Sequence, residues 1–161
     1  MIHWEEFTQT VAILWKGFGL TLYIGLWGIG LALIVGVSLA LMRLSGNRLL
    51  SAFAFSYSTV FRGTPLLVQL FLLYYGVGMI GWVKDVPLLW WLFSDGTRTA
   101  ILAITLNSGA YVGEVFRGGF QSVPKGQIEA AQSIGMSAWQ CCKRVRFPLA
   151  IRQALPAYSN E

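Results

Sequence analysis

The sequence predicts an all-α protein that is embedded in a membrane, and three observations support this fold class. The mean hydropathy is +0.59 and 12% of the residues are charged, whereas soluble domains carry about 25% charged residues. Three apolar runs have about the length, roughly 20 residues, that a helix needs to cross a bilayer. The chain also contains 18 Gly and 7 Trp, and membrane helices tolerate glycine and use tryptophan as an interfacial anchor.

The apolar runs predict three complete spans, at about residues 18–42, 65–82 and 99–116. Residues 48–61 are amphipathic and rich in aromatic side chains, which predicts a helix lying along the membrane interface. A further apolar segment at residues 149–161 is too short to cross a bilayer. We interpret it as the start of a fourth span, in a single transmembrane domain that is incomplete at its C-terminus.

The Lys and Arg residues are concentrated on one side of the predicted spans. Nine of the twelve lie between the first and second spans or after the third, and these are Arg43, Arg48, Arg62, Arg117, Lys125, Lys143, Arg144, Arg146 and Arg152. Both regions face the same side because two spans separate them. Cationic loops stay in the cytoplasm, so the N-terminus is predicted to lie outside. Membrane insertion thus explains the net charge of +5 without a nucleic-acid partner, and Arg62 is expected to snorkel to the interface as a helix anchor.

Small residues form a stripe along the first predicted span. They recur every four residues, as Gly28, Ala32, Gly36 and Ala40, and the third span carries a second pair, Gly109 and Gly113. Small residues let helices approach closely within lipid, so these positions are predicted to pack against another helix. The sequence leaves open whether that helix belongs to the same chain or to a second copy.

Polar side chains in the third span form a candidate substrate pathway, because such groups usually face a bundle interior or an aqueous cavity. They are Asn107, Ser108, Tyr111 and Glu114. Glu114 could meet the ammonium group of a substrate, or it could pair with Arg117 three residues later. Asn107 could contact substrate or form a hydrogen bond between helices. Both alternatives stay open for each residue.

Residues 117–148 are a polar insert that predicts two short helices. Gly135 suits a left-handed C-terminal cap for the first helix. Ser137 and Gln140 have the spacing of a capping box that starts the second, and Pro148 is predicted to end or kink that helix.

The first helix of the insert is predicted to offer a contact surface, because Ala130 and Ala131 leave one side of it bare. A helix-turn-helix that reads DNA is the sharper alternative, but an insert tethered to the bilayer at both ends could hardly enter a major groove. The insert could also be an ordinary cytoplasmic loop that is helical only because of its composition.

The insert resembles the EAA loop of ABC-importer permeases. In that loop Glu-Ala-Ala is followed after three residues by Gly, and after nine more by Ile-x-Leu-Pro. Here Glu129, Ala130 and Ala131 precede Gly135 at that spacing, and the second part reads Val145-Arg146-Phe147-Pro148, with Val and Phe in place of Ile and Leu.

Further stretches are similar to the histidine, glutamine and arginine permeases of the polar amino-acid branch. They are residues 61–76, 106–131 and 154–161. The resemblance implies the transmembrane-domain fold of type I ABC importers, with about three of an expected five spans present, in a bacterial inner membrane. The nearest likeness is to permeases for arginine and other basic amino acids.

The resemblance also implies how such a chain would work. In the family the EAA loop is a coupling helix that docks on a cytoplasmic ATPase, which here assigns coupling to Glu129, Ala130, Ala131, Gly135, Val145 and Pro148. The implied partners are two ATPase subunits, a second permease subunit that is identical or a paralogue, an extracytoplasmic solute-binding protein and an amino-acid substrate. ATP and magnesium would bind the ATPase. This chain, which has no G-x-x-x-x-G-K-[ST] sequence, is expected to contribute no catalytic residue, metal site or cofactor.

Two other functions compete with this interpretation. A secondary transporter or channel would need no ATPase and should show charged or broken helices in mid-membrane, whereas the predicted spans are nearly free of charge. A membrane scaffold would use the insert merely to recruit a cytoplasmic partner. Neither alternative accounts for the EAA spacing.

Overall fold

The computed structural model describes residues 4–159, with the side chains of all of these except residues 5 and 6. Helices make up almost all of this range, and no strand occurs in it. The α-helices are α1 (Trp4–Leu44), α2 (Arg48–Gly63), α3 (Leu66–Phe71), α4 (Gly81–Asp85), α5 (Pro87–Phe93), α6 (Gly96–Gln121), α7 (Lys125–Ser133), α8 (Ala138–Cys141) and α9 (Phe147–Tyr158). Leu72–Gly76 and Cys142–Arg146 form π-helical segments, and Val77–Met79 is a 3₁₀ turn.

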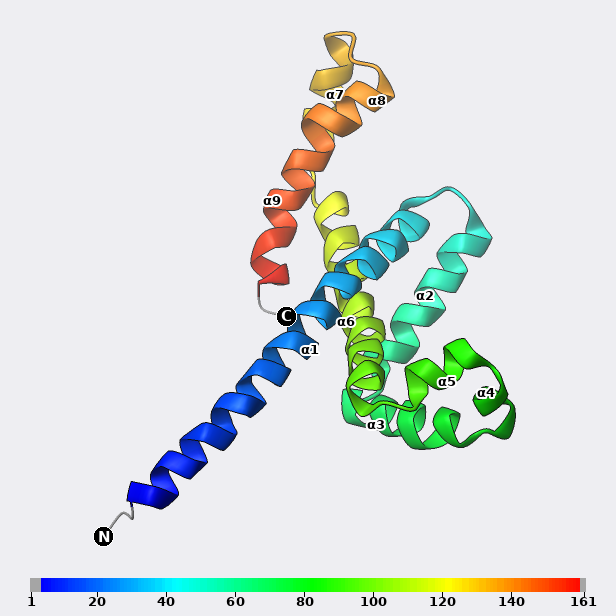
Figure 1. Ribbon diagram of the computed structural model, residues 1–161. Coiled ribbons are helices and arrows are strands. Elements are labelled where there is room, and N and C mark those ends of the chain that lie inside the picture. The colour runs from blue at the N-terminus through cyan, green and yellow to red at the C-terminus, as the bar shows by residue number, and fades with distance from the viewer. Residues whose placement is uncertain (1–3, 160–161) are drawn as a thin grey trace.

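Two long helices, α1 and α6, form the centre of the molecule (Figure 1). Both are long and apolar enough to cross a membrane, over Phe7–Leu44 and Gly96–Gln121. The predicted spans 18–42 and 99–116 lie inside them, and α1 begins well before the first span. Contacts advance together along the two helices, from Gly28 beside Ile104 to Gly36 beside Val112, so α1 and α6 run parallel.

The segment predicted as a span at residues 65–82 is broken and mixed in structure. α2 and the helical segment Leu66–Met79 meet at an angle of 102° and together have the composition of one broken span. The break follows from Pro65, which restricts the preceding residue to extended backbone; Thr64 has φ −120° and ψ 139°.

The interfacial helix predicted at residues 48–61 is present as α2, but it does not lie apart from the bundle. It packs against both α1 and α6. Asn47 caps its start, since the side-chain oxygen accepts from the backbone N–H of Leu49 at 2.9 Å. The chain then passes through α3, α4 and α5 back to the end of the bundle where α6 begins (Figure 1).

The small-residue stripe of α1 packs inside this chain, against α6. Gly28, Ala32, Gly36 and Ala40 are all buried, as are Gly109 and Gly113. A Cβ atom on Gly36 would lie 2.5 Å from Val112 Cγ1, and one on Gly109 would lie 2.8 Å from Val35 Cγ1. Both distances are too short for any side chain, so the close approach of the helices requires glycine there.

A second close crossing joins α6 to α9. A Cβ on Gly119 would lie 2.6 Å from the carbonyl oxygen of Ala150 and 2.9 Å from Ala154 Cβ. Ser122 and Gln153 form a hydrogen bond beside this contact. α9 (Phe147–Tyr158) covers most of the apolar segment at residues 149–161 that was interpreted as the start of a fourth span. Residues 160 and 161 lie outside the described residues.

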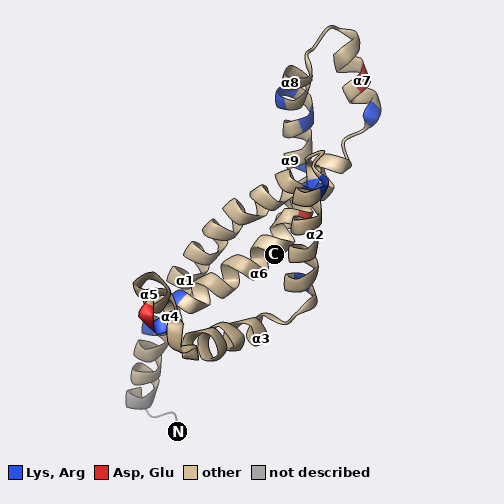
Figure 2. Ribbon diagram, turned by 90° about the vertical axis from the view of Figure 1, so that its right-hand side faces the viewer, with Lys and Arg blue, Asp and Glu red and all other residues tan. Residues whose placement is uncertain are grey.

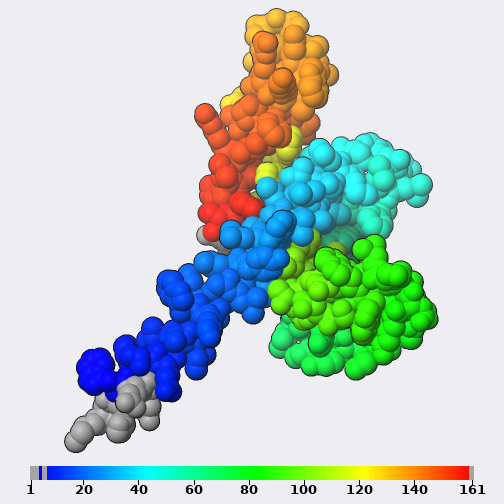
Figure 3. All heavy atoms as spheres, viewed as in Figure 1, coloured from blue at the N-terminus to red at the C-terminus, as the bar shows by residue number. Residues whose placement is uncertain are grey.

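The polar insert projects beyond the ends of α1 and α2, as the space-filling view shows (Figure 3). At the opposite end the N-terminal half of α1 extends away from the bundle, with exposed apolar side chains such as Ile13, Leu14 and Trp15. Lys and Arg gather on the insert and near its base, whereas the other end carries mixed charges (Figure 2).

Candidate functional site

The polar insert is a helical hairpin made by α7 and α8, and Gly135 forms its bend. Gly135 has φ +82°, and no other described residue has a positive φ. The N–H of Gly135 donates to the carbonyl of Gln132 at 2.9 Å, and the N–H of Met136 donates to that of Ala131 at 3.2 Å. These two bonds are the Schellman motif, so the predicted left-handed cap is confirmed.

The second helix of the hairpin starts with the predicted capping box. The Ser137 hydroxyl accepts from the Gln140 N–H at 3.3 Å, and the Gln140 side-chain oxygen accepts from the Ser137 N–H at 3.0 Å. Because the cap follows directly after the glycine bend, two independent local signals fix the angle at the tip of the hairpin.

Pro148 does not end the second helix, which was one of its two predicted effects. Helical backbone runs from Ala138 to Tyr158, through the π-helical segment Cys142–Arg146 and into α9. The N–H of Phe147 donates to the carbonyl of Cys142, five residues back. A π-helical turn widens the helix just before the proline, which relieves the clash of the ring with the preceding turn. Val145 is half-buried in this segment.

The exposed face of the hairpin differs from the predicted one. Glu129 and Ala130 are exposed, but Ala131 is only 5% exposed and lies on the inner side of α7. The large apolar side chains at the tip are instead Ile134 and Trp139, at 75% and 73% exposure. Sequence reasoning missed both; a tryptophan and an isoleucine flanking the glycine bend of a polar segment were the available signal.

The side chains of Asn107 and Gln69 donate hydrogen bonds to backbone carbonyls at the C-terminal end of α2. Both side-chain amides donate to the carbonyl of Phe61, at 3.0 Å and 2.9 Å, and Asn107 also donates to Gln69 Oε1 at 3.2 Å. Gln69 donates in addition to the carbonyl of Thr64 at 3.0 Å. The last carbonyls of a helix have no partner of their own and cannot stay unpaired in a membrane. Asn107 thus forms the hydrogen bonds between helices that were one of its two predicted roles, and its contact with substrate stays a prediction.

Arg62 lies in the last turn of α2 and its side chain is exposed; its role as an interfacial helix anchor stays a prediction. Its guanidinium is 5.2 Å from the centre of the Tyr111 ring, and the Tyr111 hydroxyl donates to the Arg62 carbonyl at 3.4 Å. Tyr111 lies near the middle of α6. Ser108, one turn before it, is half-buried.

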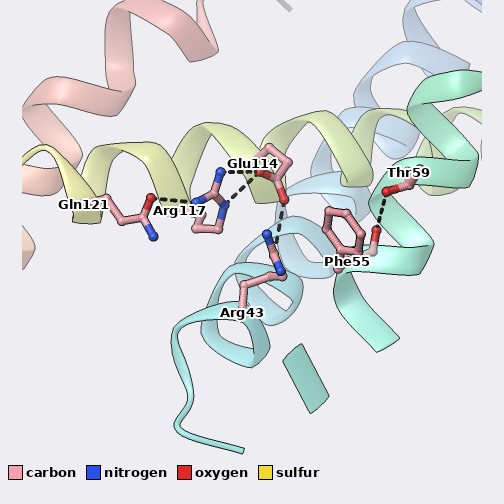
Figure 4. A network of polar contacts seen from close by, with 6 residues as sticks. All are labelled: Arg43, Phe55, Thr59, Glu114, Arg117 and Gln121. Atoms are coloured by element: carbon pink, nitrogen blue, oxygen red, sulfur yellow. Dashed lines mark hydrogen bonds and ion pairs between the residues drawn. The ribbon is translucent and has the colours of Figure 1, made fainter. Parts of the chain in front are cut away.

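Glu114 is the centre of an ion-pair network that joins α1 to α6 (Figure 4). Arg117 contacts its carboxylate at 2.7 Å and 2.8 Å, as the predicted pairing requires, and Arg43 approaches it to 3.5 Å. Arg43 also lies over the ring of Phe55 in α2, with its guanidinium carbon 4.9 Å from the ring centre. Arg117 continues the network to Gln121 at 2.6 Å. Glu114 therefore holds two arginines from different helices.

We expect Glu114→Gln to lower the stability of the protein. Removing the carboxylate leaves Arg43 and Arg117 without their partner, and breaking a buried pair costs about 3–5 kcal/mol; the side chains are 15–25% exposed, which favours the lower value. Thermal unfolding in detergent measures this loss, and Arg43→Gln with the double variant completes the cycle. Unchanged stability would show that Glu114 does not hold the two arginines together, and would favour its other predicted role as a substrate contact.

Within residues 4–159, no group of His, Cys, Asp and Glu side chains is arranged to hold a metal ion. The two cysteines, Cys141 and Cys142, are free thiols. The functional features of the described chain are therefore the hairpin, the ion-pair network and the polar contacts around the end of α2.

Residues 28–161 match the family described as the inner membrane component of binding-protein-dependent transport systems. The nopaline transport system permease protein NocM of Agrobacterium fabrum is 52% identical over 128 residues, which are 80% of this chain and 53% of NocM. The octopine transport system permease protein OccM of Rhizobium radiobacter is 42% identical over 95% of this chain and 62% of OccM. The histidine/lysine/arginine/ornithine transport system permease protein HisM of Salmonella typhimurium is 37% identical over 99% of this chain and 68% of HisM. The chain thus spans between about half and two thirds of the length of these relatives.

Two solved structures have a similar fold. A chain in the crystal structure of an amino acid ABC transporter with histidines superimposes with a TM-score of 0.83 and 32% identity, over 99% of this chain and 70% of that chain. The MetNI methionine ABC transporter, in inward facing conformations, reaches a TM-score of 0.59 at 22% identity, a likeness of fold alone. The predicted fold class, an all-helical membrane protein of the ABC-permease type, is confirmed. With the family match covering most of its length, the chain belongs to the inner membrane components of binding-protein-dependent transport systems.

Proposed function

We propose that the chain is part of a permease subunit of an ATP-driven importer for polar amino acids, with basic amino acids as the nearest substrate class. The observation that carries this proposal is the hairpin, which has the EAA spacing, a fixed bend at Gly135 and exposed apolar side chains at its tip. Membership of the family supports it, as do relatives that are known as permease proteins of transport systems for nopaline, octopine, or histidine, lysine, arginine and ornithine.

The proposed partners follow from the same family. The hairpin would dock on a cytoplasmic ATPase that binds ATP and magnesium, while a second permease subunit and a solute-binding protein complete the importer. The cations around the hairpin support the proposal that this end lies in the cytoplasm and that the N-terminus of α1 lies outside the inner membrane. The permease itself would then move substrate without hydrolysing ATP.

Ile134, Trp139 and Ala130 are proposed as the contact surface for the ATPase. Ile134 and Trp139 expose large apolar areas on a segment that otherwise carries polar side chains, and exposed apolar side chains grouped in this way mark protein interfaces. Glu129 lies beside Ala130 on exposed helix and would add a polar contact.

Movement of the docked hairpin would reach the membrane helices through two rigid connections. One is the continuous helical backbone from α8 into α9. The other is the tight contact of Gly119 in α6 with Ala150 and Ala154 in α9. Since α6 also packs against α1 along the glycine stripe, a displacement of the hairpin would be transmitted to both long helices.

We expect Trp139→Asp to separate the permease from its ATPase. Loss of a buried tryptophan anchor costs about 2 kcal/mol or more at an interface, which is about thirtyfold in affinity. The measurement is co-purification of the ATPase with the full permease, together with ATP-driven uptake of arginine and histidine into vesicles that contain the solute-binding protein. Trp139→Phe, which keeps an aromatic anchor, is the matched control and should retain most of both.

The same vesicles test the proposed function itself. Uptake that continues without ATP would indicate a secondary transporter or channel. Parent permease that binds the ATPase but shows no amino-acid uptake would indicate a scaffold. Normal ATPase binding and uptake by Trp139→Asp would remove the hairpin tip from the coupling surface.

A further inference from the structure

Arg62 is an exposed cation in the last turn of α2, at about the mid-height of the two long helices. It lies at the fifteenth position of α2, so about 20 Å of helix separates it from Arg48 at the cytoplasmic end. Its guanidinium lies over the ring of Tyr111, and Tyr111 is fifteen residues after the start of α6 and ten before its end. Charged side chains at such depths are costly and usually face an aqueous cavity or a ligand.

The backbone that carries Arg62 is held firmly in place. Tyr111 donates to the Arg62 carbonyl, and Asn107 and Gln69 donate to the carbonyl of Phe61 just before it. Gln69, in turn, is only 7% exposed. Polar side chains from α3 and α6 thus fix the last turn of α2, and the guanidinium is presented from a rigid base.

The charge of Arg62 has no counterpart among the described residues. The acidic group nearest along α6 is Glu114, and its carboxylate is occupied by Arg43 and Arg117. Arg62 forms a cation–π contact but no ion pair with a described carboxylate. Arg62, Glu114 and Arg117 line one cleft, and Arg43 also pairs with Glu114. This cluster therefore carries an excess of positive charge, which favours an anionic ligand group.

A polar cleft of about 310 Å³ opens beside this arginine. It is lined by Arg62, Tyr111, Glu114, Val115 and Arg117. Its volume is at the lower end of the range for ligand pockets, roughly 300–1,000 Å³, which suits one amino acid. A guanidinium can hold a carboxylate with two parallel hydrogen bonds.

We propose that Arg62 binds the α-carboxylate of the amino-acid substrate within the membrane. The inference rests on the proposed import function and adds a specificity-determining residue to it. Arg62 accepts the group that every α-amino acid shares, and the Tyr111 ring keeps the guanidinium oriented toward the cleft. Selection among side chains is left to other parts of the importer.

The test compares L-arginine with agmatine, which is arginine without its carboxylate. Binding of each is measured on the full permease with its ATPase in lipid nanodiscs, without the solute-binding protein. The parent should prefer L-arginine by about 10–100-fold, the range expected for one hydrogen-bonded charge pair. Arg62→Gln should lose that preference, whereas Arg48→Gln, the same change at the other end of α2, should keep it. A parent-like preference in Arg62→Gln overturns the proposal.

Arg62→Lys provides a second measurement should the Gln variant not fold. It keeps the charge but loses the paired hydrogen bonds, so L-arginine should bind at least about threefold more weakly; unchanged affinity overturns the proposal. Nanodiscs with and without anionic lipid distinguish a lipid phosphate from substrate, and a preference that changes with lipid charge also overturns it. ATPase binding and ATP-driven uptake by the parent are measured separately, so a failure of the import function is distinguishable from a failure of Arg62.

Discussion

Replacing Gly135 with Asp is expected to reduce ATP-driven uptake by about tenfold or more, the ratio that corresponds to about 1.4 kcal/mol, while the amount of inserted permease stays the same. The φ of +82° at this residue costs an L-amino acid about 1–2 kcal/mol. Asp also places a negative charge beside the C-terminus of α7, where the helix dipole disfavours it. Relief of this strain would turn α8, with Trp139, away from the angle at which it docks.

Gly126→Asp is the matched control for this prediction. Gly126 lies in the first turn of the same helix α7, has open space around its Cβ position and lacks a positive φ. A negative charge is favourable near a helix N-terminus, so this variant should bind the ATPase and transport like the parent. Vesicle uptake, normalised to inserted protein, measures both variants. Parent-level uptake by Gly135→Asp would refute the role of the bend in coupling.

The hairpin was largely predictable from sequence because its signals are local. The glycine bend and the capping box each act over a few residues, and both are confirmed. Exposure was not predictable in the same way. Ala130 and Ala131 are adjacent and identical, yet only the second is buried, since burial depends on how α7 packs against the next helix.

The broken span was not predictable from hydropathy. An apolar run shows that a segment suits lipid but does not show its direction, and the 102° bend arises at Pro65 between two apolar helices. The bend requires polar caps for the end of α2, which explains Gln69 and Asn107. It also weakens the sequence-based argument against a secondary transporter, which expected no broken helix; the hairpin and the family now carry that distinction.

The partner of the glycine stripe was open in the sequence for a related reason. Spacing every four residues predicts a close-packing face but cannot identify the helix that meets it. In the structure that helix is α6 of the same chain, and its own small residues, Gly109 and Gly113, lie against the stripe. The ion pair of Arg43 with Glu114 was likewise hidden, because it depends on the parallel alignment of α1 and α6.

Replacing Gly36 with Val should destabilise the protein strongly. The first added carbon alone would lie 2.5 Å from Val112 Cγ1 and 3.0 Å from the carbonyl oxygen of Gly109. Overpacking of this kind costs about 1–3 kcal/mol and occasionally more, and the second contact involves backbone that cannot rotate away. We expect a lower unfolding temperature in detergent and a smaller yield of inserted permease.

Gly30→Val provides the control, because Gly30 lies in the same helix with nothing within 4 Å of its Cβ position. It makes the same change in size and in helix propensity but should leave the α1–α6 contact intact. Val112→Ala removes one of the two groups that Gly36→Val would strike, so the double variant should recover part of the lost stability. Equal stability of the Gly36 and Gly30 variants would show that the stripe is not packed against α6. Partial recovery restricted to the Gly36–Val112 pair would instead locate the strain at this crossing, where the two parallel helices approach most closely.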